Sequence, residues 1–294
     1  MAERTGRGRD RAGRFFRRLL QTPLVALALL ILIGIIIMAI AAPRIAPYDP
    51  TYIDVVRRLQ PPLWTSEEGE VHLLGTDSLG RDVFSRIVYG SRISLIVGLT
   101  VVVISGTFGV LLGLISGYAG GSLLDDIIMR LADIQLAFPF LLIAIAFLAV
   151  LGPGLVNVVI VLALFGWVQY ARVVRGQTMA LREKEFVEAA RAIGVKHGRI
   201  IFRHILPNTW APTIVLASFA VASTILTEAA LSFLGLGVKP AVPTWGGMLA
   251  DGRDHITVSW WIVLFPGLAI MITVLCINVF GDWLRDYLDP RLRV

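Results

Sequence analysis

Long stretches without a charged side chain dominate this sequence. Windows free of Asp, Glu, Lys and Arg cover residues 24–42, 93–117, 134–171, 205–227 and 256–281. About 20 apolar residues in helical conformation are enough to cross the hydrocarbon core of a bilayer. The mean hydropathy of +0.76 is also too high for an ordinary soluble domain. The chain is therefore predicted to be an all-α polytopic membrane protein.

The window at 134–171 is about twice the length of one span. It contains the sequence GPG at 152–154, which would break a helix in lipid but suits a tight hairpin between two spans. The prediction is therefore six transmembrane helices, at 24–42, 93–117, 134–151, 155–172, 209–236 and 259–281.

Basic residues predict the orientation, because Lys and Arg remain preferentially on the cytoplasmic side. Of the 27 basic residues, 19 lie in segments that six spans place on the same side as both termini. These predicted cytoplasmic segments are the basic tail at 1–23, the loop at 116–133, the loop at 173–208 together with Arg172 just before it, and the tail at 282–294. Residues 43–92 and 237–258 become the extracytoplasmic loops. This predicts a cell-membrane protein with both termini in the cytoplasm.

The Arg-rich start has two other interpretations, a signal peptide and a nucleic-acid-binding arm. The 19-residue window that follows is long for the apolar region of a signal peptide, so an uncleaved anchor is favoured. The pI of about 9.9 is then explained by membrane topology and contact with anionic lipid. We expect no nucleic-acid partner.

Side chains that would indicate a cofactor are scattered. Cys276 is the single cysteine, and the four histidines form no i, i+4 pair. The sequence also lacks the G-x-x-x-x-G-K-[ST] loop that binds nucleotide phosphates. We expect no metal site, no cofactor and no catalytic residue in this chain, so any nucleotide energy must come from another chain.

Two features inside the predicted spans differ in meaning. Gly109, Gly113 and Gly117 repeat every four residues, which favours close packing against a neighbouring helix. Glu228 is the one acidic residue placed inside a span, where a carboxylate is costly. Two interpretations of Glu228 stay open: a residue of the substrate pathway or gate, and a structural carboxylate that is hydrogen-bonded across a helix interface or close enough to the outer surface to be hydrated.

The cytoplasmic loop contains a charged segment with helical periodicity. From Arg182 to Ile193, apolar residues at i, i+3, i+4 and i+7 predict one apolar face, formed by Phe186, Ala189, Ala190 and Ile193. Gly194 is a helix stop, and a second short helix is expected from Lys196 until Pro207 ends or kinks it. Such an element either covers the inner ends of the spans or presents a surface to a partner, and periodicity does not decide between them.

The residues of this segment nevertheless resemble a known signature. EAA, then three residues, Gly, ten residues and ILP, is similar to the cytoplasmic EAA loop of ABC importer permeases, which in that family docks into the ATPase subunit as a coupling helix. His204 departs from the general motif, which favours Ile there, but FRHILPN is similar to the peptide-importer form. The resemblance assigns ATPase coupling to Glu188, Ala189, Ala190, Gly194, Leu206 and Pro207.

Three longer stretches, at 72–95 and 227–249 and the closing GDWLRDYLDPRL, resemble the C-type permease subunit of dipeptide, oligopeptide and glutathione importers. The resemblance implies a type I ABC importer permease fold and a transport subunit that is not an enzyme. It also implies a second, B-type permease, two ABC ATPase subunits that bind ATP and Mg²⁺, and an extracytoplasmic peptide-binding protein. Nickel importers share this architecture, so glutathione and a nickel chelate stay open as substrates.

Three tryptophans lie in or next to the second extracytoplasmic loop. Trp245 follows a proline-rich stretch and is interpreted either as an anchor at the membrane interface or as part of a gate, while Trp260 and Trp261 are expected to be interface anchors. An ion-coupled secondary transporter would need more ionisable groups near mid-membrane than Glu228 alone. An intramembrane enzyme would need a catalytic pair in the bundle. The ABC importer permease is therefore the favoured function.

Overall fold

The computed structural model describes residues 21–288 apart from residues 68 and 240, so the predicted basic tail lies almost entirely outside the described residues. The elements, in chain order, are α2 (Pro23–Ile40), α3 (Ala42–Ile45), η1 (Val55–Arg57), β1 (Trp64–Thr65), β2 (Val71–His72), α4 (Val83–Tyr118), α5 (Leu123–Leu136), α6 (Phe140–Leu151), α7 (Leu155–Arg182), α8 (Glu185–Ala192), α9 (His197–Ile200), the π-helical turn η2 (Ile201–Ile205), α10 (Leu206–Phe233), α11 (Trp245–Gly252), η3 (Arg253–His255) and α12 (Trp261–Leu288).

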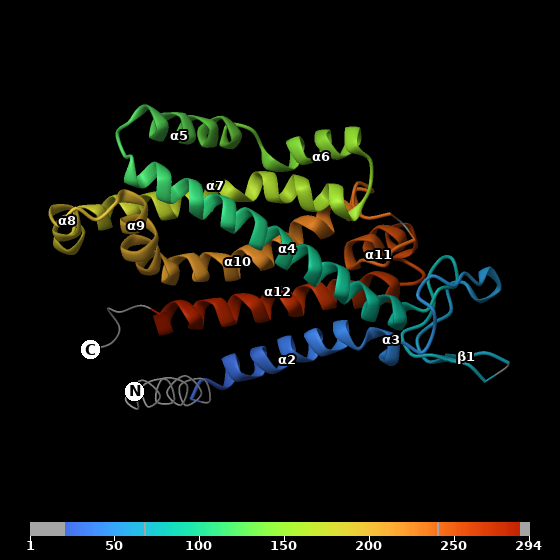
Figure 1. The fold of residues 1–294 in the computed structure, drawn as a ribbon. Helices are drawn as coiled ribbons and strands as arrows, with labels where there is room; N and C mark the ends of the chain where they lie inside the picture. The colour runs from blue at the N-terminus through green and yellow to red at the C-terminus, as the bar shows by residue number, and fades with distance from the viewer. Residues whose placement is uncertain (1–20, 68, 240, 289–294) are drawn as a thin grey trace.

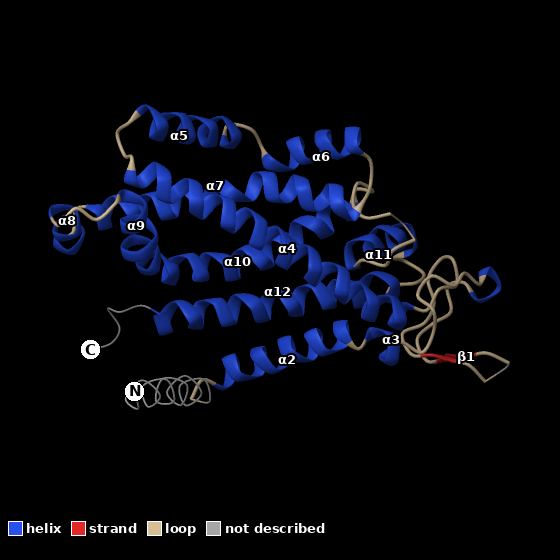
Figure 2. Ribbon diagram, in the orientation of Figure 1, coloured by secondary structure: helices blue, strands red, loops and turns tan. Residues whose placement is uncertain are grey.

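Long helices run side by side along one axis and form the body of the molecule (Figure 1). Within the described residues, five helical segments are long and apolar enough to cross a membrane, or six if the bent pair α5–α6 counts as one span. The short helices α8 and α9 lie at one end of this bundle, and the β1–β2 hairpin with its loops lies at the other (Figure 2). The predicted all-α architecture is confirmed.

The glycine stripe joins α4 to α7, as the four-residue spacing predicts. A Cβ on Gly109 would lie 2.3 Å from the carbonyl oxygen of Trp167. A Cβ on Gly113 would lie 2.6 Å from the carbonyl oxygen of Ala171. Gly117 meets the next turn of α7 in the same way. Only hydrogen fits at these positions, so the two backbones approach as closely as the residue type permits.

The third predicted span is not one helix over 134–151. Helix α5 ends at Leu136 and α6 begins at Phe140, and the two axes meet at 86°. Pro139 is the N-cap residue of α6, and a proline disfavours helical conformation in the residue before it. A scan for charge-free windows does not detect this break, because proline carries no charge. The hairpin predicted at 152–154 does form between α6 and α7.

The end of the bundle opposite α8 and α9 contains regular structure that the charge-free windows do not predict, the β1–β2 hairpin (Figure 1). The hairpin pairs Trp64 with His72, and His72 Nδ1 lies 2.9 Å from Asp82 Oδ1. Asp82 also caps α4, accepting a hydrogen bond from Ser85 N. Burial, together with nearby carboxylates, raises the pKa of the Tyr48 phenol, which donates to a backbone carbonyl of β2. The hairpin is thus fastened to the start of a long membrane helix.

Candidate substrate cavity and coupling surface

The predicted coupling segment forms at the end of the bundle opposite the hairpin (Figure 1). Helix α7 extends to Arg182, and α8 then begins at Glu185, so the expected single helix from residue 182 is interrupted. Gly194 has a φ of +78° and takes the left-handed conformation that ends α8. Glu188 and Ala189 are exposed, whereas Ala190 is buried.

The predicted apolar face of α8 divides into two parts. Ala190 packs inward together with Val187, which the periodicity does not single out. Phe186 and Ile193 are 44% and 80% exposed, and Ala189 is exposed beside them. Apolar side chains that the chain itself leaves uncovered are typical of a contact surface for a partner. We name Phe186, Ala189 and Ile193 the α8 contact face.

The second helix does not end at Pro207. Helix α9 continues through η2 into α10, and Pro207 lies in the first turn of α10. The π-helical turn lies directly before Pro207, and a local π adjustment of this kind accommodates a proline within a continuous helix. Leu206 packs against a buried cluster that includes Leu114 of α4 and Val174 of α7. Helices α8 and α9 and the start of α10 therefore share one buried cluster with α4 and α7.

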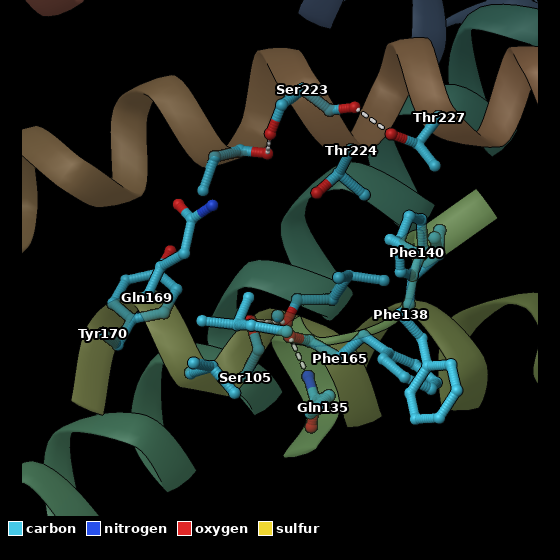
Figure 3. Close-up of a pocket in the computed structure, with 16 residues that line it drawn as sticks. Ser105, Gln135, Phe138, Phe140, Phe165, Gln169, Tyr170, Ser223, Thr224 and Thr227 are labelled. Carbon is cyan, nitrogen blue, oxygen red and sulfur yellow. Dashed lines mark hydrogen bonds between the residues drawn. The ribbon is translucent and has the colours of Figure 1, made fainter. Parts of the chain in front are cut away.

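A cavity of about 300 Å³ lies midway between the two ends, among α4, the α5–α6 break, α7 and α10 (Figure 3). Its lining includes five hydroxyl groups and two primary amides, and three phenylalanines lie around the α5–α6 break. The polar lining residues are Ser105, Gln135, Gln169, Tyr170, Ser223, Thr224 and Thr227, and the phenylalanines are Phe138, Phe140 and Phe165. None of the sixteen described residues that line the cavity is Asp, Glu, Lys, Arg or His.

Hydroxyl groups on two walls donate their protons to their own helices. Ser105 Oγ donates to the carbonyl oxygen of Val101 at 2.7 Å. Ser223 Oγ and Thr227 Oγ1 donate to α10 carbonyls at 3.1 Å and 2.7 Å, as the dashed lines in Figure 3 mark. The oxygen lone pairs remain available to accept hydrogen bonds. These walls therefore favour ligand groups that carry N–H or O–H donors.

Gln135 holds the α5–α6 break against α7. Its Nε2 donates to the carbonyl oxygen of Phe165 at 2.8 Å, and its Oε1 accepts from Trp167 Nε1 at 3.0 Å.

Gly166 of α7 faces Ser105 of α4, and a Cβ on Gly166 would lie 2.9 Å from the serine Cβ. No sequence motif points to this set, because its members come from helices far apart in the chain.

Neither of the two predicted pathway residues is among the residues that line the cavity. Glu228 is fully buried and accepts a hydrogen bond from Ser232 Oγ at 2.7 Å. Trp245 is buried between α4 and α10, and its Nε1 donates to the carbonyl oxygen of Ile87 at 3.0 Å. The interface-anchor interpretation is therefore wrong for Trp245. The assignment of both residues to a gate stays a prediction.

Trp260 and Trp261, both expected to be interface anchors, differ from each other. Trp261 is buried and donates from Nε1 to the carbonyl oxygen of Thr76 at 3.1 Å, so the anchor expected from sequence is instead a core residue. Trp260 is half exposed, as an interface anchor requires. In the part of the chain that the structure describes, no group of three or more His, Cys, Asp or Glu side chains is placed to hold a metal ion.

Comparison with known families agrees with this architecture. Residues 109–294 match the family described as the binding-protein-dependent transport system inner membrane component. This chain belongs to that family. Residues 11–62 also match the N-terminal transmembrane domain of oligopeptide transport permease C. The chain is therefore a multi-pass inner-membrane permease subunit of an ABC importer, which works with other components of its transporter and is not an enzyme.

Similar proteins match along almost the whole chain. The di/tripeptide transport system permease protein DppC of Pseudomonas aeruginosa is 47% identical over 265 residues, covering 90% of this chain and 87% of its own length. The dipeptide transport system permease protein DppC of Alkalihalophilus pseudofirmus is 47% identical over 278 residues, covering 95% of this chain and 89% of its own. The glutathione transport system permease protein GsiD of Pectobacterium atrosepticum is 42% identical, covering 95% and 91%.

A solved structure has the same fold. A chain of the MetNI methionine ABC transporter, in an inward-facing conformation, superposes with a TM-score of 0.57 at 17% identity. The match covers 70% of this chain and 97% of the other. The predicted type I importer permease fold is confirmed, and a similarity at this level of identity concerns the fold alone.

Proposed function

We propose that this chain forms half of the translocation pathway of an importer for di- and oligopeptides. The observation that carries the substrate class is the set of relatives named for di/tripeptide and dipeptide transport, 47% identical over at least 90% of this chain. The neutral cavity with free hydrogen-bond acceptors supports it, because a peptide carries backbone N–H donors. Glutathione is the second candidate, on the basis of the glutathione permease relative, which is 42% identical.

The proposed partners are a B-type permease that completes the pathway, two ABC ATPase subunits that bind ATP and Mg²⁺, and an extracytoplasmic peptide-binding protein. Lipid surrounds the many exposed apolar side chains of the spans. The α8 contact face supports docking of an ATPase subunit, because it is apolar, exposed and flanked by the charges of Glu185, Glu188 and Arg191. Closure of the ATPase pair would then move α8 and α9, and with them the long helices.

Reconstitution of the assembled importer in proteoliposomes tests this function. ATP is enclosed in the vesicles, where it reaches the complexes whose ATPase subunits face inward, and the binding protein is added outside with radiolabelled Ala-Ala or glutathione. We expect ATP-dependent uptake of the dipeptide. Uptake of glutathione alone would select the second candidate, and uptake driven by an ion gradient without ATP would contradict the proposal.

Gly194 provides a specific test of the coupling role. Valine at this position must adopt positive φ, which costs about 1–2 kcal/mol, although a Cβ there meets no atom within 4 Å. Gly194→Val should therefore distort the α8–α9 turn without affecting the spans. We expect binding-protein-stimulated ATPase activity of the complex to fall by about an order of magnitude, which is what such a strain corresponds to.

Gly198→Val is the matched control, because Gly198 also has open space around it but lies in α9 without positive φ. This variant should keep its stimulated ATPase activity. Equal activity in both variants, with normal membrane insertion, would contradict the coupling role of the segment.

A further inference from the structure

The polar groups that line the cavity are all uncharged. Its wall has hydroxyls, amides and aromatic rings, and the described residues that line it include no charged side chain. Asp133 of α5 and Arg172 of α7, two or three residues from lining residues in the sequence, line a separate pocket and pair with each other. Glu228 of α10 follows the lining residue Thr227, but it is fully buried beside Ser232 and does not line the cavity. On the wall that this chain contributes, a peptide would therefore meet dipoles and not a fixed counter-charge.

The electrostatic consequence depends on the net charge of the substrate. A zwitterionic peptide carries equal and opposite charges whose fields partly cancel, and neutral hydrogen-bonding groups solvate both ends. A peptide with a net charge loses hydration that no fixed charge in the wall replaces, and in a medium of low dielectric constant this loss is costly. A neutral wall therefore discriminates by net charge while tolerating different apolar side chains beside the phenylalanines.

We propose that the neutral wall makes net charge the property by which this permease selects its peptides, and that Gln169 is a specificity-determining residue. This inference rests on the proposed peptide transport. Gln169 is exposed on α7 in the cavity, and its amide makes no hydrogen bond within the described residues. In Figure 3 it lies with Tyr170 on the side of the cavity away from Phe138 and Phe140. It is therefore free to contact a charged peptide end.

Gln169→Glu tests the proposal, because it introduces one negative charge with almost no change of shape. The assembled importer is supplied with Ala-Ala, Lys-Ala or Glu-Ala, which carry net charges of 0, +1 and −1 near neutral pH, and one binding-protein preparation is used throughout. The quantity measured is the ratio of Lys-Ala to Glu-Ala uptake. Comparison of this ratio between variants cancels the preference of the binding protein. We expect Gln169→Glu to raise the ratio about tenfold.

Gln177→Glu is the matched control, since Gln177 is exposed on the same helix but does not line the cavity. Its ratio should equal that of the unmodified importer. Ser223→Asp is an alternative single variant that places the negative charge on the α10 wall. If Gln169→Glu does not assemble, this variant is tested in its place and should also raise the ratio. An unchanged ratio in an assembled cavity variant that still transports Ala-Ala would overturn the inference and leave the proposed function intact. Failure of the unmodified importer to transport any of the three peptides would instead overturn the proposed function.

Discussion

At the scale of single residues, the close contact between α4 and α7 is possible because three residues of α4 are glycines and have no Cβ. Three glycines of α4 face backbone carbonyls of α7, and each would bring a Cβ within 2.6 Å of an oxygen or closer. Real Cβ atoms do not approach backbone oxygen so closely, so any other residue must push the helices apart. The helix pair that forms one wall of the cavity is therefore sensitive to a single methyl group.

Gly113→Val should destabilise the permease. The added side chain would collide with the backbone of Ala171 and the Cβ of Val174. Overpacking of this kind costs about 1–3 kcal/mol, so we expect a lower Tm for the complex in detergent. Gly34→Val is the control, because a Cβ on Gly34 of α2 would meet no atom within 4 Å and should leave Tm unchanged. Equal Tm values for the two variants would refute the close contact.

An isosteric substitution distinguishes a structural role of Glu228 from a role in the substrate pathway. Its Oε1 accepts from Ser232 Oγ, and an amide oxygen accepts the same hydrogen bond. Because Glu228 does not line the cavity, we expect Glu228→Gln to keep peptide uptake within about twofold, whereas Glu228→Ala lowers Tm by removing a partner from a buried hydroxyl. Loss of uptake in a stable Glu228→Gln complex would support the pathway role and contradict this expectation.

Residue type predicts some environments and not others. The glycine spacing identifies a helix contact because small size alone determines where these residues fit. The position of a tryptophan depends on two properties, its large apolar ring and its N–H donor, so it is buried only where a backbone carbonyl can accept a hydrogen bond from that N–H. Trp245 and Trp261 find such carbonyls in Ile87 and Thr76, which are 158 and 185 residues away in the chain. Contacts across such distances leave no local pattern.

At the scale of elements, the bent pair α5–α6 is held by polar contacts at the start of α5 and at the break. Gln135 fastens the break to α7, and Asp125 fastens the start of α5. The Asp125 carboxylate accepts from Arg175 Nε at 2.6 Å and Nη2 at 2.7 Å, and also from Ser116 Oγ. The break is thus a built feature next to the cavity, and α5 is fixed to α7 at both of its ends.

Asp125→Asn should break the ion pair that holds the start of α5 against Arg175 of α7. Asn keeps the shape but leaves the Arg175 guanidinium without its carboxylate. Breaking a buried ion pair costs about 3–5 kcal/mol, and because the Arg175 side chain is 29% exposed, we expect about 1–3 kcal/mol here. The measurement is the Tm of the complex. Asp126→Asn is the control, since Asp126 is exposed and should tolerate the change. Similar Tm losses in both would indicate a general charge effect.

The existence of the elements was more predictable than their ends. Charge-free windows locate the long helices because hydrophobicity is summed over many residues. Proline has different effects at two positions: a span breaks at Pro139, whereas the helix that contains Pro207 continues, with a π-helical turn directly before the proline. Helix ends that depend on a single residue in this way are harder to predict. The cavity was not predicted, because its wall is assembled from separate helices with ordinary polar residues.

At the scale of the whole molecule, the two ends of the bundle carry different structural elements. Helix α2 begins and α12 ends at the end that contains α8 and α9, and the β1–β2 hairpin lies at the opposite end (Figure 1). Basic residues are concentrated in the segments assigned to the first end, 19 of 27 in all. The positive-inside preference therefore predicts that the α8 end is cytoplasmic, which is the side on which an ATPase subunit is available.

Single-cysteine labelling in intact cells tests this orientation. In a Cys276→Ser background, Val56→Cys should react with a membrane-impermeant maleimide, because Val56 lies in the hairpin region and is 91% exposed. Asp126→Cys, exposed at the start of α5, should react only after the membrane is permeabilised. Cys276→Ser alone provides the background signal. The opposite labelling pattern would invert the topology and remove α8 from the reach of a cytoplasmic ATPase, so the same experiment bears on the mechanism proposed for the whole complex.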